Sequence, residues 1–146
     1  MNDAPSEIAL QSLFDKSLVS LPSASGEWPC FVSSMADVPS MLDNCLAVYD
    51  EEPVKDGRLM HDGTVILHHV VSVRLRANAY SVGWAKIESI ATALDAMHDV
   101  NVTLGSNSYT LNNASRQSGV NALGLEAGTQ RRFIFELRYA LTLTSL

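Results

Sequence analysis

The chain is poor in cysteine and has no long hydrophobic run. Among its 146 residues are only two cysteines, Cys30 and Cys45. Two cysteines do not build a disulfide framework, so we expect two small buried hydrophobic side chains in a reducing compartment. No segment approaches the roughly 20 apolar residues that span a membrane. The N-terminal residues MNDAPSE also lack the basic start and apolar stretch of a signal peptide. We therefore expect a protein made in a cytoplasm, with no membrane partner.

An excess of positive charge is also missing. The formal net charge is −6, whereas a surface that grips nucleic acid needs clustered Lys and Arg. The composition, with 47% apolar and 18% charged residues, is that of a globular chain. We expect a single domain over residues 1–146 that does not bind DNA specifically.

Catalytic and metal-binding signatures are absent as well. His68 and His69 are neighbours on a predicted strand, so they point to opposite faces and cannot chelate one ion. No zinc-ligand spacing and no Gly-x-Ser-x-Gly motif occurs. Gly119, Gly124 and Gly128 match neither nucleotide-binding spacing. The sequence predicts no catalytic residue, no metal site, no cofactor and no enzyme.

What the chain does contain is a long alternating segment followed by a helical one, over Thr64–Met97. Alternation places one set of residues on a core face, and that set runs from Val65 to Ala77 in steps of two. The other face becomes basic at its far end, at Arg74 and Arg76. After Asn78 the period changes to three and four residues, which predicts one apolar stripe on a helix, made of Trp84, Ile87, Ile90, Ala91, Leu94 and Met97.

The rest of the chain can be assigned around this nucleus. We expect a helix over residues 4–20, capped by Ser6 or Asp3 and stopped by Pro22, a connection over 23–43, and a strand over 45–49. An acidic loop then leads into a projecting hairpin extension that ends near Asp62 and Gly63. Later expected elements are a hairpin turning at 105–107, a long polar loop over 112–130, and a closing strand over 132–143.

This order is helix, strand, long strand, helix, hairpin, strand. It predicts an α+β fold with a mostly antiparallel or mixed β-sheet and two α-helices packed on one face.

Charged residues of the two long strands form the most informative pattern. If the closing strand pairs beside the long strand, Glu136 would lie across from Arg74 or Arg76, and Arg132 and Arg138 would extend the same face. One interpretation is a solvated face, with ion pairs worth a few tenths of a kcal/mol each. The other is a face that meets another subunit, where such pairs set register and partner choice.

Short motifs follow one another in a fixed order along the chain: Val48-Tyr49-Asp50 and Pro53, Gly57-Arg58-Leu59-Met60, His61-Asp62-Gly63, the strand Val71–Ala77, the helix near Tyr80, the Tyr109 hairpin, the Leu123-Gly124 step, and Arg131-Arg132-Phe133-Ile134-Phe135. In these motifs and in the order of its elements, the whole chain resembles the tail terminator proteins of long-tailed bacteriophages, also called tail completion or minor capsid proteins. No catalytic signature contributes to the resemblance.

The resemblance implies a structural virion protein that is assembled in the host cytoplasm. Such proteins form a six-membered ring on the last ring of the tail tube and stop tube growth. They present a surface to the head-proximal connector, or neck, and DNA passes through the lumen. The implied partners are therefore other copies of the chain, the major tail tube protein and the connector.

Charge then suggests which residues face which partner. Negative walls would repel passing DNA, so we expect the acidic residues Asp50, Glu51, Glu52 and Asp56 on or near the lumen. The remaining charged residues are expected at ring contacts or on the face toward the tube, and they are Arg74, Arg76, Arg132, Glu136 and Arg138.

Two other functions stay open. A neck or head-to-tail connector subunit shares the size and the acidity. A small ligand-binding or enzymatic α+β domain would need a concave pocket with convergent polar groups, and the sequence names none.

Overall fold

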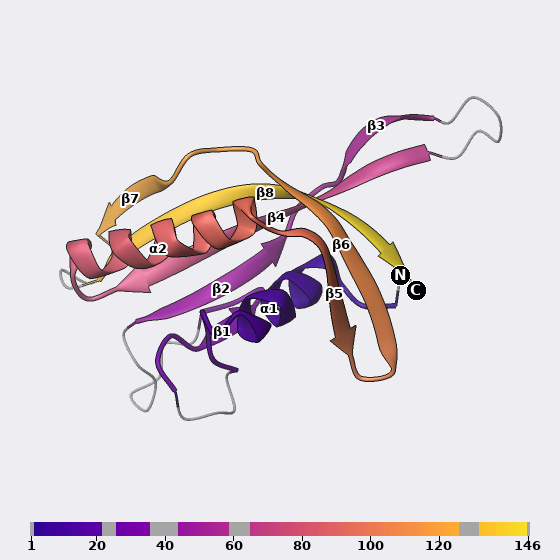
Figure 1. Ribbon diagram of the computed structural model, residues 1–146. Helices are drawn as coiled ribbons and strands as arrows, with labels where there is room; N and C mark the ends of the chain where they lie inside the picture. Colours follow the sequence, from indigo (N-terminus) through magenta and orange to yellow (C-terminus); the bar gives the residue numbers. More distant parts are fainter. Residues whose placement is uncertain (1, 22–25, 36–43, 59–64, 126–131, 146) are drawn as a thin grey trace.

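The computed structural model describes residues 2–21, 26–35, 44–58, 65–125 and 132–145, and of 55–58 and 65–67 only the backbone. These residues form two helices and eight strands (Figure 1). The elements are α1 (Pro5–Asp15), β1 (Cys30–Val32), β2 (Cys45–Asp50), β3 (Val54–Arg58), β4 (Val65–Ala77), α2 (Tyr80–Asp95), β5 (His98–Leu104), β6 (Asn107–Arg116), β7 (Asn121–Leu125) and β8 (Phe133–Ser145). Within the described residues, no helix is both long enough and apolar enough to cross a membrane.

The strands form one mixed, mostly antiparallel sheet. Its strand order is β1-β2-β4-β8-β6-β5, with β3 added to β4 and β7 added to β8. β1 runs parallel to β2, and the other pairs are antiparallel. The two 13-residue strands β4 and β8 lie side by side at the centre, from the pair His69–Leu141 to the pair Ala77–Phe133. The predicted α+β class is therefore confirmed.

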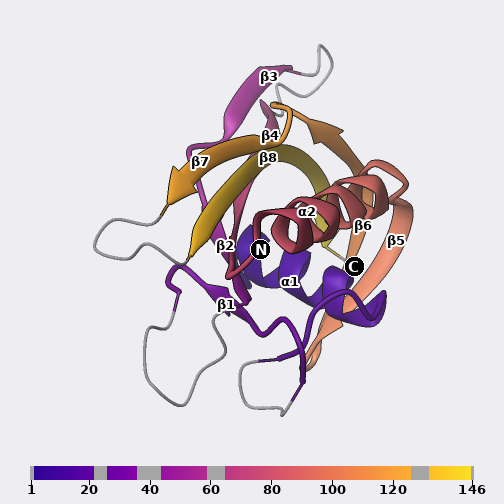
Figure 2. The same ribbon diagram turned by 90° about the vertical axis from the view of Figure 1, so that its left-hand side faces the viewer.

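Both helices pack on one face of the sheet, which curves around them (Figure 2). The core between helices and sheet contains the predicted inward residues of the two long strands, from Val71 to Ala77 in β4 and from Phe135 to Leu141 in β8. The apolar stripe of α2 is buried from Ile87 onward, as predicted. Trp84 is the exception, because its side chain remains 40% exposed.

The first helix is shorter than the sequence predicts, and a different residue caps it. It ends at Asp15 because Ser17 has a left-handed backbone (φ 60°). The Leu18 N–H donates to the Leu13 carbonyl, which completes a Schellman motif before Pro22 is reached. At the N-terminus, neither Ser6 nor Asp3 is the cap: the N-cap residue is Ala4, which makes no side-chain cap.

Asp50, at the end of β2, supplies the missing cap from another part of the chain. Its carboxylate accepts hydrogen bonds from the Ser6 amide at 2.9 Å and from the Ser6 hydroxyl at 2.6 Å. A carboxylate at a helix N-terminus also interacts favourably with the helix dipole. The fold therefore uses one acidic residue of the predicted lumen loop to fix α1 against the sheet.

The predicted hairpin extension is present and projects from the body. β3 pairs with the first residues of β4, from Val54–His68 to Arg58–Val65. This ribbon leaves the body at the end opposite to β7 and to the start of α2 (Figure 1). Its predicted tip near Asp62 and Gly63 lies outside the described residues.

The prediction of a long polar loop over residues 112–130 is wrong in part. β6 continues to Arg116, and β7 occupies Asn121–Leu125. Alternation was hidden because β6 has a register shift between Leu111 and Asn113. In β7 every residue is exposed and Gly124 has a positive φ of 85°, so no buried face marks the strand.

Candidate functional site

Cross-strand charge pairs occupy the sheet face that points away from the helices. Arg74 lies opposite Glu136, and its Nε is 2.7 Å from Glu136 Oε2. The Arg74 guanidinium also lies over the Tyr49 ring, 5.4 Å from its centre. Arg138 forms an ion pair with Glu51. We call these five residues the outer-face ladder, and its Arg74–Glu136 pair confirms the pairing predicted from the sequence.

Electrostatics in the ladder are mild because its side chains are partly hydrated. Burial raises the pKa of the Tyr49 phenol, although Arg74 opposes the shift. Half-exposed ion pairs of this kind contribute about 0.2–1 kcal/mol each. The ladder is therefore a patterned polar surface that remains accessible at Arg74 and Arg138, whose side chains are 46% and 48% exposed.

Two other predicted interface arginines lie differently. Arg76 is 2% exposed, so it belongs to the interior of the subunit. It has no surface to offer a partner, and we exclude it from the contact residues. Arg132 directly precedes β8 and is half-buried.

The four predicted lumen acids do not form one exposed cluster. Asp50 binds Ser6, and Glu51 pairs with Arg138. Glu52 is exposed in the connection between β2 and β3. Asp56 has its backbone in β3, and its side chain lies outside the described part of the chain.

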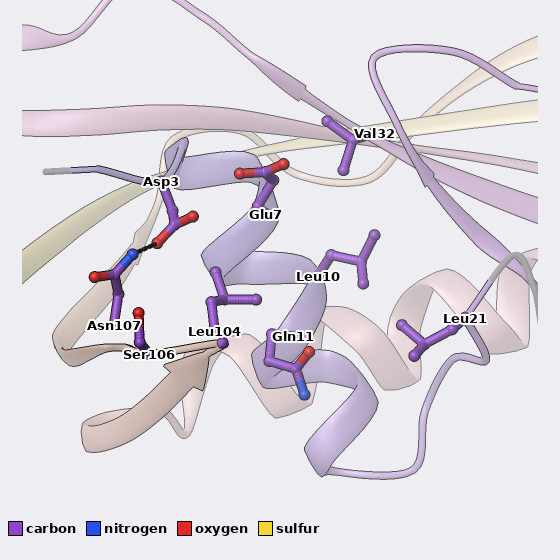
Figure 3. Close-up of a pocket in the computed structure, with 10 residues that line it drawn as sticks. Asp3, Glu7, Leu10, Gln11, Leu21, Val32, Leu104, Ser106 and Asn107 are labelled. Atoms are coloured by element: carbon purple, nitrogen blue, oxygen red, sulfur yellow. Dashed lines mark hydrogen bonds between the residues drawn. The ribbon is translucent and has the colours of Figure 1, made fainter.

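A groove of about 550 Å³ runs between α1 and the turn from β5 to β6 (Figure 3). Its apolar wall includes Leu10 and Leu104, and its polar rim carries Asp3 and Glu7. Sequence reasoning found no such pocket, because its residues come from distant positions. Both carboxylates also serve the fold: Asp3 Oδ2 accepts hydrogen bonds from Tyr109 and Asn107, and Glu7 accepts one from the Ala4 amide.

The described histidines are His68 and His69, neighbours on β4, and His98, the first residue of β5. His68 Nδ1 lies 3.1 Å from the Thr142 hydroxyl, and His98 lies 3.3 Å from Asp99. Burial lowers the pKa of His69, with Asp50 opposing the shift. Among the described residues, no three His, Cys, Asp or Glu side chains are grouped to hold a metal ion. His61 lies outside the described residues.

A charged network ties the end of α2 to β6 and β8. Arg116 Nη2 lies 2.5 Å from Asp95 Oδ2, and the Tyr139 hydroxyl lies 2.7 Å from Asp95 Oδ1. Burial raises the pKa of Asp95, but hydrogen bonds from Arg116 and Tyr139 outweigh it and leave that pKa below its usual value. An acid at a helix C-terminus is unfavourable, so we assign Arg116 a structural role.

An exposed apolar surface lies at the start of α2. Tyr80 stacks on Trp84, with ring centres 6.3 Å apart, and its edge meets Phe133 at 5.6 Å. Leu125 of β7 pairs with Phe133. Four side chains here are 40–50% exposed, and we call them the apolar end: Tyr80, Trp84, Leu123 and Leu125.

Sequence reasoning missed the apolar end for a specific reason. Trp84 has the helical spacing of a core residue, yet β8 stops the helix from burying it. Gly83 lets α2 approach the sheet so closely that a Cβ there would lie 2.5 Å from Phe135 Cε2. Phe135 takes the place beneath the helix, and Trp84 covers its edge with the ring centres 6.3 Å apart.

Comparison with known proteins gives no functional assignment. No family model matches the chain, and no curated protein does. Solved structures that match include a protein without a descriptive name. It is 14% identical over 95% of this chain and 97% of the other, with a TM-score of 0.42. A likeness of that size carries no argument about function.

Proposed function

We propose that this protein is a structural subunit of a ring, six-membered in the form we favour, that caps the head-proximal end of a bacteriophage tail tube. The ring ends tube polymerisation, offers a surface to the connector and lets DNA pass through its lumen. The protein would then be part of the virion and would not act as an enzyme.

The observation that carries this proposal is the presence of two unlike exposed surfaces at opposite ends of the molecule. One is the projecting β3–β4 ribbon, and the other is the apolar end (Figure 1). A contact between unlike surfaces is head-to-tail, and head-to-tail contacts generate rings when the rotation closes. A self-complementary patch would instead give a closed dimer.

Charge adds support for the lumen and for the tube face. The net charge of −6 and the exposed Glu52 at the base of the ribbon suit a wall past which DNA slides without sticking. Within the acidic set, Glu52 and Asp56 remain the lumen candidates, whereas Glu51 pairs with Arg138 of the ladder and Asp50 anchors α1. The ladder residues Arg74, Glu136 and Arg138, with Arg132, are the candidates for contact with the tube.

The test is electron microscopy of the purified protein with tail tubes assembled from the major tail tube protein of the same phage. We expect a ring at one tube end and tubes that stop growing. The charge reversals Arg74→Glu and Arg138→Glu should weaken capping, and Lys16→Glu, on the exposed end of α1, is the matched control. A protein that leaves tube growth unchanged would refute the proposal. Binding to the connector alone would make it a neck subunit.

The groove beneath α1 favours a second candidate function. Two carboxylates on the rim of an apolar wall suit a small amine with an alkyl stem. Calorimetry with a diamine such as cadaverine measures such binding, which Glu7→Gln should weaken. Gln11→Ala, on the same wall, should retain the charge-dependent part. The absence of any heat of binding would exclude this candidate.

A further inference from the structure

β7 is an edge strand without charge or proline, and its pairing with β8 shifts register between Ala122 and Gly124. It pairs with β8 on one side, and no other described strand pairs with it. All five of its residues are exposed, and its sequence, Asn-Ala-Leu-Gly-Leu, carries neither a charge nor a proline. Natural proteins blunt exposed edges with charges, proline, bulges or a covering element, because an open edge pairs with another strand. β7 has the bulge but no charge, proline or covering strand among the described residues, so a further strand can be added along it.

The apolar end lies directly beside this edge. Leu123 and Leu125 belong to β7, and Tyr80 reaches Phe133, the β8 partner of Leu125. Large side chains offer about 150–250 Å² each, so four that are 40–50% exposed present roughly 400 Å² of apolar surface. A stable interface buries about 800 Å² per partner. Side chains of the apolar end would supply about half of that area, and a strand added along β7 would supply the rest.

The opposite end of the molecule offers a strand of matching length. β3 has five residues, as β7 has. Within the described residues it pairs with β4 alone, through a register shift between Lys55 and Gly57, and no described strand pairs with its other edge. Its first residue, Val54, is 49% exposed, and its sequence Val-Lys-Asp-Gly-Arg carries both signs of charge. These charges protect β3 against pairing with a second charged edge, whereas a strand without charge, such as β7, opposes no like charge when β3 lies next to it.

We infer that the β7 edge and the apolar end of one copy receive the β3 edge of a second copy. This inference rests on the proposed ring, and it names the contact that builds the ring. β3 of each subunit continues the sheet of its neighbour, so backbone hydrogen bonds supply register and the apolar end supplies buried area. Because donor and acceptor edges lie on different ends, each subunit makes the contact twice, once with each neighbour.

Disulfide trapping between two single variants tests the contact. Leu123→Cys places a thiol on β7, and Val54→Cys places one on β3. Both positions are exposed, so neither change disturbs the core. The native thiols are buried, which keeps them out of the reaction. After mixing and mild oxidation, we expect the mixed product to form about tenfold faster than either self-product, because the contact raises the effective concentration of the two thiols.

Two further variants, Asn121→Cys and Ala122→Cys, test other registers of the added strand. Neighbouring side chains on a strand point to opposite faces, so each of these variants is mixed with Val54→Cys and oxidised in the same way. Self-products of Leu123→Cys that form as fast as the mixed product would overturn the inference in favour of a two-fold β7–β7 dimer. Equal, slow reaction of every pair at protein concentrations where the wild type sediments as an oligomer would also overturn it.

A charge added to the β7 edge tests whether the contact is needed for self-association. Leu123→Lys places on β7 the kind of residue that protects natural edges, and it should reduce self-association at least about tenfold. Phe14→Lys, an exposed position on α1, is the matched control and should assemble normally. Retained assembly of Leu123→Lys would refute the contact.

The two proposals fail in different ways. If the mixed disulfide forms but the oligomer never caps a tail tube, the strand contact stands and the tail-tube function falls. If the wild type caps tubes while the mixed disulfide does not form, the function stands and the strand contact falls.

Discussion

Replacing Asp50 with alanine should separate the structural acid of the β2–β3 region from its surface acids. The substitution removes two hydrogen bonds to Ser6, whose side chain is fully buried. Loss of an N-terminal cap costs about 0.5–2 kcal/mol. A buried donor left unsatisfied costs about 1–3 kcal/mol. Together these costs span about 1.5–5 kcal/mol. Because Asp50 itself is exposed, we take the lower part of that span and expect Asp50→Ala to lose about 2–3 kcal/mol of unfolding free energy.

Urea denaturation followed by far-ultraviolet circular dichroism measures this loss, with thermal unfolding as a second readout. For a domain of this size, 1 kcal/mol corresponds to about 3–4 °C, so the midpoint should fall by roughly 6–12 °C. Glu52→Ala is the matched control, because it removes the same charge from an exposed position two residues away. Its effect should stay within about 0.5 kcal/mol.

A double-mutant cycle with Ser6→Ala isolates the hydrogen bond from the Ser6 hydroxyl, because the Ser6 amide can still donate to Asp50 in that variant. If the hydroxyl bond contributes to the effect, Asp50→Ala should cost about 1 kcal/mol less in the Ser6→Ala background than in the wild type. The reasoning is refuted if Asp50→Ala and Glu52→Ala have equal effects, or if the two changes at the contact are additive.

Three further predictions concern the core and the titratable groups. Gly83→Ala should destabilise the protein by about 1–3 kcal/mol in urea, since the added Cβ meets the Phe135 ring at 2.5 Å; an unchanged effect in a Phe135→Leu background would contradict this cause. The folded-state pKa of Asp95 is depressed. Its ion pair with Arg116 therefore stabilises the fold above the unfolded pKa of about 3.9, and this stabilisation is lost as pH falls through the folded pKa. The difference in unfolding free energy between wild type and Asp95→Asn should close over that range, and a constant difference would exclude the ion pair as its cause. Burial raises the pKa of the Cys30 thiol to about 12, so a thiol reagent at pH 8 should label it only in urea, and labelling of the native protein would show that the site opens.

Much of the central sheet could be predicted because its residues carry a local signal. Core residues recur in steps of two along β4 and β8, and those at both Val73 and Leu137 are buried as predicted. Their side-by-side pairing also placed Glu136 opposite Arg74. Alternation with a period of two defines the faces of a strand without knowledge of its neighbours, so this part of the outer-face ladder was accessible from sequence.

Other features were hidden because they depend on contacts between distant segments. Arg76 repeats the pattern of Arg74, yet the fold buries one and exposes the other. Ser6 and Asp50 are 44 positions apart, and only their approach shows that Asp50 caps α1. The spacing of Trp84 predicts a core residue, but the close approach of Phe135 leaves part of its surface in water.

The amino-acid sequence by itself determined the α+β class, the long central strands, the inward stripe of α2 and the acidic balance of this protein. Each follows from periodicity or composition, which are properties of neighbouring residues. The tertiary structure alone decided that β7 is an open edge, that the apolar end is exposed, and that the ribbon lies at the opposite end (Figure 1). These features depend on which strand pairs with which and on where the sheet stops, because an edge exists only where no further strand is present to accept its hydrogen bonds.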